Sequence, residues 1–217
     1  MVSGLKNKNG KPVLLKMVAE IQKNKDYLGE VDGLIGDGDH GMNMNKGFTM
    51  FGEQIAAKEI GFSEGLDELG TLLFSKIGGS MGPIYGTVFT GMAEAGEDLE
   101  DIDTAGLSKM IDAGLTGLHD VVEAQVGDKT LVDTLGPANE ALKKAAKEGK
   151  SLSEALAEMK AAAAQGRDST KDLAAKFGRS SRLGERSRGV LDAGAVSCCI
   201  ILTAMADGIT EQLGAGA

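Results

Sequence analysis

Cysteine is scarce in this sequence, and so are long hydrophobic runs. The two cysteines, Cys198 and Cys199, are adjacent in an apolar segment, which leaves neither a disulfide framework nor the spaced ligands of a zinc site. We expect both thiols to be buried in a reducing compartment. The N-terminal segment has no apolar core, and the longest apolar stretch, 193–206, is shorter than the roughly 20 residues that span a bilayer. We expect a soluble, cytoplasmic protein.

Basic residues are outnumbered. The chain has 217 residues with 23 Lys and Arg against 32 Asp and Glu, a formal net charge of −9. This balance argues against nucleic acid or an anionic membrane as the main partner. An anionic ligand must therefore be neutralised locally. The length fits one domain over residues 1–217, with no linker-like segment inside it.

Proline and aromatic residues are rare, whereas glycine is abundant. The chain has 3 Pro, no Trp and 32 Gly, about twice the roughly 7% of average glycine usage. Collagen is excluded because it requires abundant proline and a strict glycine period, and the 42% apolar content excludes a disordered linker. The positions of the glycines therefore carry the information.

Apolar residues recur at steps of three and four, and alternating β-branched strands are absent, which predicts an all-α architecture of about eight helices. Ser151 and Glu154 form a capping-box pattern at one helix start. A further helix is expected over about 104–125. The expected apolar stripes include Val13, Leu14, Met17, Val18 and Ile21; Leu66, Leu69, Leu73, Phe74 and Ile77; Leu107, Met110, Ile111, Leu115, Leu118, Val121 and Val122; and Leu131, Leu135, Ala138, Leu142 and Ala145.

The glycines concentrate at four places between helices or at their ends. Glycine lets backbone N–H groups approach a ligand closely, and a helix N-terminus favours an anion. Any one cluster can be explained by tight turns alone, but four converging clusters predict a phosphate site. The clusters are Gly36, Gly38 and Gly41; Gly78, Gly79, Gly82 and Gly86; Gly127 and Gly136; and Gly178, Gly184, Gly189 and Gly194.

The first cluster contains a G-x-G-x-x-G pattern, but a dinucleotide-binding fold does not follow. That fold requires a preceding strand, whereas helices are expected here and two aspartates lie within the pattern. An EF-hand loop is also excluded, because Met42 stands where glycine is needed and Phe48 where a bidentate Glu is needed. The chain contains no Walker A sequence.

Three aspartates, Asp32, Asp37 and Asp39, remain as the chemical content of this loop. Carboxylate oxygens are hard ligands that suit Mg²⁺, which completes its shell with water and substrate phosphates. Without metal, the three charges would repel and raise their own pKa values. The alternative is a solvated acidic loop in which Asp39 caps the next helix. Divalent ions would reconcile the acidic chain with a bound nucleotide.

Other polar residues lie close to the glycine clusters. His40 can be a metal ligand, a phosphoryl acceptor, a nucleotide contact or a polar helix-start residue, whereas His119 is expected to be structural. Lys129 and Thr130 can supply a cation and a hydroxyl at a helix start, with Asp133 one turn later. The basic stretch 178–189 lacks helical spacing, which favours a loop held over a ligand, its arginines binding phosphate oxygens.

Four segments together resemble one family over essentially the whole chain. They are IGDGDHGMNMNKGF at 35–48, GGSMGPIYGT at 78–87, GDKTLVDTLGPA at 127–138 and GRSSRLGERSRGVLDAGAVS at 178–197. In this order they resemble the nucleotide-binding L subunits (DhaL) of bacterial dihydroxyacetone kinases. The resemblance implies an all-α barrel of eight antiparallel helices with ADP and two Mg²⁺ at one end.

The resemblance also implies residue roles. Asp32, Asp37 and Asp39 would be the metal ligands and, with Arg179, the catalytic groups. The nucleotide contacts would be His40, Gly41, Met42, Asn43, Ser80, Met81, Thr130, Arg179, Leu191, Asp192 and Ala193.

A relay between subunits is the implied activity. A phosphohistidine on a partner subunit (DhaM) would rephosphorylate bound ADP to ATP in place. The γ-phosphoryl group would then pass to dihydroxyacetone, which a histidine of the K subunit (DhaK) holds as a hemiaminal. Neither histidine of this chain would carry a phosphoryl group. The chain would contribute positioning and charge neutralisation.

Two departures from the family pattern affect the nucleotide site. Met81 replaces a serine found in many members, and Asp192-Ala193-Gly194 replaces Asp-Pro-Gly. Alternatives therefore stay open: a subunit serving another short ketose, free ATP instead of phosphoenolpyruvate as donor, a nucleotide-loaded regulatory adaptor that binds a transcription factor, and a homodimer. The distant fatty-acid kinase domain is disfavoured because it usually has Thr at the position of His40.

Overall fold

The computed structural model describes residues 4–215, which form nine α-helices and one short strand pair. The helices are α1 (Lys11–Lys23), α2 (Lys25–Ile35), α3 (His40–Ile55), α4 (Phe62–Lys76), α5 (Met81–Gly96), α6 (Thr104–Val121), α7 (Val132–Lys147), α8 (Leu152–Ser169) and α9 (Ala193–Ala215). Three 3₁₀ helices accompany them, η1 (Asn7–Asn9), η2 (Thr170–Asp172) and η3 (Arg179–Ser187). The strands β1 (Leu5–Lys6) and β2 (Asp101–Ile102) pair antiparallel, a small exception to the expected absence of strands.

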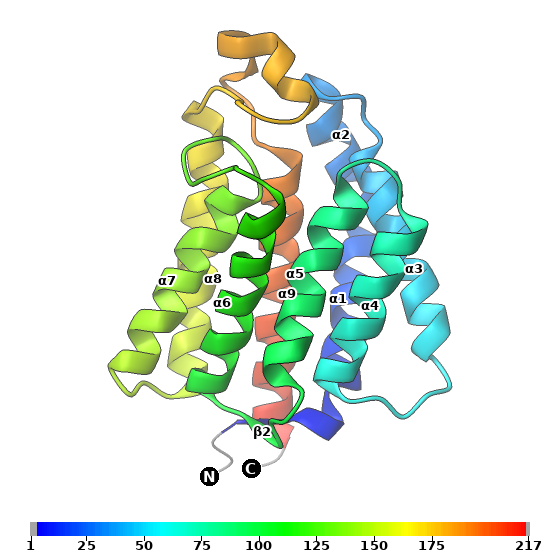
Figure 1. The fold of residues 1–217 in the computed structure, drawn as a ribbon, viewed down its shortest axis with the longest axis vertical. Helices are drawn as coiled ribbons and strands as arrows, with labels where there is room; N and C mark the ends of the chain where they lie inside the picture. The colour runs from blue at the N-terminus through cyan, green and yellow to red at the C-terminus, as the bar shows by residue number, and fades with distance from the viewer. Residues whose placement is uncertain (1–3, 216–217) are drawn as a thin grey trace.

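Eight of the helices form a closed antiparallel ring (Figure 1). From α3 to α9 each helix packs on the next along the chain, and α1 closes the ring by packing on both α9 and α3. The expected eight-helix barrel is thereby confirmed. The ninth helix, α2, arises because the chain breaks at Asn24, whose side-chain amide donates to the carbonyl oxygen of Glu20 at 2.8 Å and ends α1 there.

The last helix, α9, forms much of the core and is apolar on nearly every face. Its buried residues include Val196, Cys198, Cys199, Ile201 and Leu202, which confirms that both cysteines are buried. At 23 residues it is longer than the expected apolar stretch 193–206, and its length and composition would suffice to cross a membrane. However, 72% of its apolar window is buried against the other helices, as in the core helix of a globular protein.

Many glycines serve contacts between helices rather than loops, contrary to the expectation from their clustering. A Cβ atom added at Gly86 of α5 would lie 3.0 Å from the carbonyl oxygen of Gly70 in α4. A Cβ at Gly41 would lie 2.0 Å from the carbonyl oxygen of Lys25. Only glycine lets these helix pairs approach so closely, because any side chain would overlap the neighbouring backbone.

The helix ends agree with the sequence in part. The capping box of Ser151 and Glu154 is present at the start of α8. In contrast, α6 ends at Val121 instead of near 125. Val121 and Phe74 were expected on the apolar stripes but are 60% and 62% exposed. Both lie in the last turn of a helix, where the outward face has no neighbouring helix to cover it.

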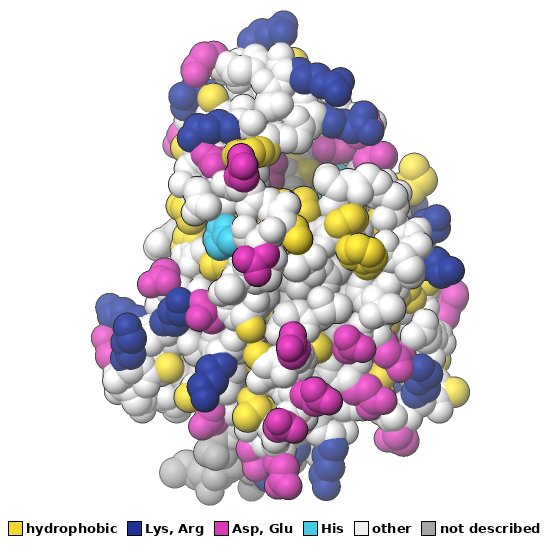
Figure 2. All heavy atoms as spheres, in the orientation of Figure 1, with side chains coloured by type: hydrophobic (Ala, Val, Ile, Leu, Met, Phe, Trp, Pro, Cys, Tyr) yellow, Lys and Arg dark blue, Asp and Glu magenta, His cyan; other side chains and the backbone are white. Residues whose placement is uncertain are grey.

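The two ends of the barrel differ in character. The chain termini and β2 lie at one end, and the segment that contains η3 crosses the other end (Figure 1). We call residues 171–192, which run from within η2 to the residue before α9, the strap. In Figure 2 basic side chains gather over the strap, and acidic side chains gather over the opposite end. The strap end is therefore where the acidic chain is locally suited to an anion.

Candidate nucleotide and metal site

A cavity of about 350 Å³ lies at the strap end of the barrel. The starts of α3, α5 and α9 and the loop before α7 contribute to its wall, and the strap contributes Phe177, Gly178, Arg179 and Ser180. All four glycine-containing segments of the sequence therefore meet at one cavity. The expected convergence of these segments is confirmed, although several of their glycines lie inside helices.

Three carboxylates stand together on the cavity wall. One oxygen from each of Asp32, Asp37 and Asp39 lies within 4.8 Å of the others. Gly36 makes this grouping possible, because a Cβ atom there would lie 2.3 Å from Oδ1 of Asp32. Burial, together with the charges of Asp37 and Asp32, raises the pKa of Asp39. The expected rise in pKa is thus found at Asp39.

The alternative role for Asp39 as a helix cap is absent from the structure. Asp39 precedes α3, but its side chain accepts no hydrogen bond from the first turn of that helix. Asp32 Oδ2 accepts from the N–H of His40 at 3.3 Å and Asp37 Oδ2 pairs with Arg179, which leaves the other carboxylate oxygens of the cluster for a cation. The donor set of three closely spaced hard oxygens fits Mg²⁺.

Helix N-termini provide the electropositive part of the site. The N-cap side chains of α3 and α5 make no cap hydrogen bond, and in α3 only the N–H of His40 donates to a neighbouring side chain, Asp32 Oδ2 at 3.3 Å. In contrast, α6 and α8, which start at the opposite end, are capped by Asp103 and Ser151. Uncapped N–H groups and the helix dipole favour an anion. The cavity therefore combines acids suited to a cation with helix starts suited to a phosphate, as a metal–nucleotide complex requires.

The basic stretch expected to form a loop is a 3₁₀ helix instead. In η3 only Gly184, at φ 52°, departs from helical geometry. This helix carries Arg179 over the cavity, where its Nη2 lies 2.9 Å from Oδ2 of Asp37. Arg179 is the arginine of the strap that lines the cavity wall. The expectation that this stretch covers a ligand site agrees with its position.

A chain of hydrogen bonds links three helices at the cavity wall, which His40 and Tyr85 line. Nε2 of His40 lies 2.8 Å from Oγ of Ser197, and that oxygen lies 2.6 Å from the hydroxyl oxygen of Tyr85. The Tyr85 hydroxyl also donates to the carbonyl oxygen of Gly194. Burial lowers the pKa of His40 to about 4 and raises that of Tyr85. His40 is therefore neutral at physiological pH and fixes α3 against α9.

The start of α9 is held by Asp192. Its Oδ2 accepts a hydrogen bond of 2.7 Å from the N–H of Ala195, as an N-cap does. Burial raises the pKa of Asp192 to about 6. In the first turn of α7, both carboxylate oxygens of Asp133 accept hydrogen bonds from the preceding loop, from the N–H of Gly127 at 2.6 Å and of Thr130 at 2.7 Å. These carboxylates organise backbone and keep the loop and α9 in place.

Most of the residues singled out in the sequence line this cavity. They are Asp32, Asp37, Asp39, His40, Ser80, Met81, Lys129, Thr130, Arg179, Asp192 and Ala193. Four others do not line it. Gly41 packs against α2, Met42 is exposed, Asn43 is half-buried and Leu191 packs on the core. His119 is exposed in the last turn of α6.

Sequence reasoning missed the apolar part of the wall and the hydrogen-bond chain. Tyr85 and Ser197 lie within quoted motifs, but nothing in their spacing pairs α5 with α9. The apolar lining residues are Ile35, Ile84, Val122, Ala124, Leu131 and Phe177. A cavity with one apolar wall and a few placed polar groups is the usual form of a small-molecule site.

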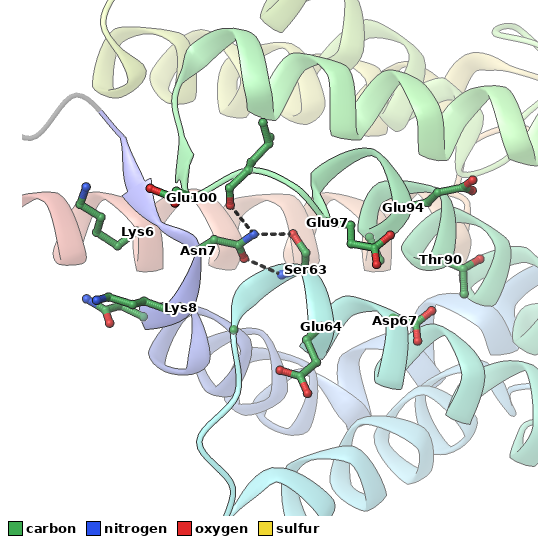
Figure 3. A pocket seen from close by; sticks show the side chains of 14 residues that line it. Lys6, Asn7, Lys8, Ser63, Glu64, Asp67, Thr90, Glu94, Glu97 and Glu100 are labelled. Carbon is green, nitrogen blue, oxygen red and sulfur yellow. Dashed lines mark hydrogen bonds between the residues drawn. The ribbon is translucent and has the colours of Figure 1, made fainter.

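A second and larger cavity, about 1250 Å³, lies toward the opposite end of the barrel. Carboxylates of α4, of α5 and of the residue that follows α5 flank it, including Glu64, Asp67, Glu94 and Glu97 (Figure 3). Asn7 lies at its centre, donating to Ser63 Oγ at 3.0 Å and accepting from the Ser63 N–H at 2.9 Å. This acidic groove has the wrong charge for a phosphate, so its size does not make it the nucleotide site.

The fold and the site together define a class: a helical barrel with a carboxylate cluster and helix N-termini around one end cavity. The family model described as the DAK2 domain matches residues 34–207. The chain belongs to this family.

Curated relatives cover most of the chain. The ADP-binding subunit DhaL of PEP-dependent dihydroxyacetone kinase 1 from Listeria innocua is 40% identical over 85% of this chain and 88% of its own length. The corresponding subunit from Escherichia coli is 37% identical over 83% of this chain and 87% of its own length. L-erythrulose kinase from Pectobacterium atrosepticum is 31% identical over 84% of this chain, which spans only 31% of that enzyme.

Solved structures share the fold. The dihydroxyacetone kinase of C. freundii superposes with a TM-score of 0.71 at 21% identity, over 95% of this chain and 36% of that one. The same enzyme in complex with AMP-PNP and Mg²⁺ superposes with a TM-score of 0.70 at 20% identity, over 95% of this chain and 35% of that one. This chain therefore corresponds in fold to about a third of that enzyme.

Proposed function

We propose that this chain is the ADP-binding subunit of a dihydroxyacetone kinase, in which the bound nucleotide passes a phosphoryl group to the ketose. The observation that carries this proposal is the cluster of Asp32, Asp37 and Asp39, with oxygens within 4.8 Å of one another, on the wall of the strap-end cavity. The names of the curated relatives support the same activity.

Asp32, Asp37 and Asp39 would hold Mg²⁺, two ions in our proposal. The bound metal would neutralise the nucleotide phosphates and join them to an acidic chain. The chain's own residues supply the rest of the charge balance. Arg179 reaches the cavity from the strap, and the start of α5, whose N-cap side chain makes no cap bond, lies on its wall. Phosphoryl transfer depends on such positioning and charge stabilisation.

The apolar wall would receive the nucleotide base. Ile84, Val122 and Leu131 form part of this wall, and Phe177 approaches it from the strap. His40, held neutral by burial, contributes an uncharged polar surface beside the acids. Ser80, Thr130 and the Asp192–Ala193 turn would contact the nucleotide, while Gly41, Asn43 and Leu191 would act only through the backbone or the packing behind the site. Met42 is exposed outside the cavity.

Partner subunits would dock on the strap end. Exposed apolar side chains are concentrated at the ends of elements around the cavity, among them Leu34, Met42, Phe74, Val126 and Phe177. Exposed apolar side chains that gather on one face mark a protein interface. We assign this rim to a ketose-binding K subunit (DhaK type), because the ketose must meet the bound nucleotide there. A phosphohistidine subunit (DhaM type) would use the same end to recharge ADP. The proposal places the chain in the cytoplasm, with neither nucleic acid nor membrane as a partner.

A kinase for another short ketose is the second candidate. It is favoured by the 31% identity to L-erythrulose kinase. Because the ketose would be held by the partner, this chain's cavity does not distinguish the two substrates.

The test is to purify the chain and measure its retained nucleotide. Ketose and K subunit are then added with either free ATP or phosphoenolpyruvate and the relay proteins. We expect retained ADP, no ketose phosphorylation by the chain alone, and phosphorylation of dihydroxyacetone when the partners are present. Absence of bound ADP, together with no ADP-dependent thermal shift in Mg²⁺, would contradict the proposal. Faster turnover of erythrulose than of dihydroxyacetone would favour the second candidate.

A further inference from the structure

Lys129 is a buried lysine in an unusual backbone conformation. Its side chain is fully enclosed, with 1% of the residue exposed. Among the described residues, 4–215, it is the one non-glycine residue with positive φ, at 61°. A left-handed conformation costs a non-glycine residue of order 1 kcal/mol or more. The surrounding structure must therefore hold Lys129 in place through strong local contacts.

The ammonium group of Lys129 bonds to backbone instead of to a carboxylate. Nζ donates to the carbonyl oxygens of Thr170 and of Val190, the latter at 2.6 Å. No ion pair of Lys129 occurs in the part of the chain that the structure describes. Burial lowers the pKa of this amine, while the charges of Asp192 and Asp133 oppose that effect. The sequence suggested that Lys129 supplies a positive charge to a bound ligand. In the structure its ammonium group already donates hydrogen bonds to two backbone carbonyl oxygens.

The two carbonyl groups lie at opposite ends of the strap, one just before it and one within it. Thr170 immediately precedes it, and Val190 lies two residues from its end. Further bonds join the same points: the N–H of Gly189 donates to the carbonyl oxygen of Lys171 at 2.8 Å, and the N–H of Asp192 donates to Oγ1 of Thr170 at 3.0 Å. Lys129 is thus the side chain from outside the strap that bonds to both of its ends.

We propose that Lys129 is a positioning residue that closes the base of the strap and thereby holds Arg179 and the first turn of α9 over the nucleotide cavity. The proposal rests on the proposed nucleotide binding and adds to it a device for keeping the nucleotide in place. Lys129 and the next residue, Thr130, both lie on the cavity wall, so the loop that anchors the strap also forms part of the site. Because the ammonium is bonded to two carbonyl oxygens of the backbone, its loss should act on the cavity through release of the strap.

The experiment compares Lys129→Met and Lys129→Gly with a control, Lys171→Met. Lys129→Met removes the ammonium and keeps the backbone strain, whereas Lys129→Gly removes both. Lys171 is an exposed lysine in the strap, and its side chain makes no hydrogen bond or ion pair among the contacts of the described residues. The readouts are hydrogen exchange of the nucleotide-free protein and ADP affinity in Mg²⁺.

We expect both Lys129 variants to exchange the amides of residues 171–192 at least tenfold faster than the wild type, with α4 and α5 unchanged. ADP affinity should fall about tenfold in both, and Lys171→Met should match the wild type. Wild-type protection of the strap amides in Lys129→Gly would overturn the proposal. Any faster exchange in Lys129→Met would then come from the strained backbone conformation and not from loss of the ammonium. Weakened ADP binding with an unchanged strap would also overturn it, because Lys129 would then act on the nucleotide directly.

Amide exchange in α4 and α5 distinguishes a local release of the strap from a general loss of stability. Equal acceleration of exchange in these helices and in the strap would overturn the positioning role. If neither variant folds, amine acylation of the wild-type protein provides the test. The amine of Lys129 should then be acylated no faster than the strap amides exchange, and at least a hundredfold more slowly than the amine of Lys171. Equal reactivity of the two lysines would overturn the proposal. Failure of the wild type to bind ADP would contradict the proposed function but leave the nucleotide-free exchange result to decide the role of Lys129.

Discussion

Arg179 and Asp37 form an ion pair of 2.9 Å that joins the strap to the carboxylate cluster. Both side chains are partly exposed, so the pair by itself adds little to stability. The ion pair matters because it joins a residue of the strap to an expected metal ligand. A cation bound at Asp37 would compete with Arg179 for the carboxylate, and the released guanidinium would then be free to bind a phosphate oxygen.

Replacing Arg179 with Met should weaken ADP binding roughly 10- to 150-fold, because a charge-assisted hydrogen bond to phosphate contributes roughly 1.5–3 kcal/mol. Isothermal titration in Mg²⁺ measures the change. Arg182→Met is the matched control, since Arg182 lies on the same 3₁₀ helix, is exposed and does not line the cavity. An equal loss in both variants would show that only the charge of the strap matters.

Removing the hydroxyl of Ser197 should loosen the wall behind His40. In Ser197→Ala the Tyr85 hydroxyl and His40 Nε2 lose their shared partner, which should cost about 1–3 kcal/mol of unfolding free energy. We also expect ADP affinity to fall severalfold, because α3 and α9 both contribute to the cavity.

Thr134→Val is the control for Ser197→Ala. Thr134 Oγ1 is a buried hydroxyl that donates to the carbonyl oxygen of Ala195 at 3.0 Å without contacting His40. Urea unfolding and ADP titration of both variants make the comparison. Our account requires the control to lose stability but to keep ADP affinity within about twofold. If Ser197→Ala binds ADP as the wild type does, the hydrogen-bond chain has no part in the site.

Acidification from pH 7 to pH 5 should reveal opposite effects of His40 and Asp192. Burial lowers the pKa of His40 from 6.5 to about 4. The unfolded chain therefore binds the proton first, and the free energy of unfolding decreases as the pH is lowered. Burial raises the pKa of Asp192 from 3.8 to about 6, so the folded chain binds the proton first and stability rises.

The free energy of unfolding of the nucleotide-free protein, measured in urea across this range, separates the two groups. Asp192→Asn should lose stability more steeply than the wild type, by about 1 kcal/mol at pH 5. His40→Gln should change in the opposite direction. Parallel curves for all three proteins would mean that neither group titrates as its burial implies.

Phe74→Ser should impair phosphoryl transfer to the K subunit without affecting the nucleotide. Phe74 is 62% exposed at the end of α4, and loss of a central apolar contact costs an interface about 1–2 kcal/mol. We expect unchanged ADP affinity and a roughly tenfold lower rate at limiting partner concentration. Leu15→Ser is the control, because Leu15 is an exposed apolar residue on α1 outside both cavities. Equal effects of the two substitutions would place the docking surface elsewhere.

Much of the fold follows from local spacing. The apolar steps and the Ser151–Glu154 capping box predicted helices that are present. The break at Asn24 and the exposure of Phe74 could not be predicted. The first depends on one side chain bonding its own helix end, and the second on which helix face finds a neighbour.

The polar part of the site could be predicted because its residues lie close together in sequence. Asp32, Asp37 and Asp39 belong to one short segment, so their spacing already brought them together. Tyr85 and Ser197 come from helices far apart in the chain, and only the register between α5 and α9 pairs them. The packing role of Gly41 likewise depends on the approach of α2.

The most direct measurement is the titration of ADP into nucleotide-free protein, with and without Mg²⁺, for the wild type and for Asp37→Asn. The substitution keeps the size of the side chain and removes the charge that a metal needs. Our account predicts tight, Mg²⁺-dependent binding to the wild type and at least a hundredfold weaker binding to Asp37→Asn, with equal helical content by circular dichroism. Equal, Mg²⁺-independent binding to both proteins would contradict the assignment of the metal and nucleotide site to this cavity.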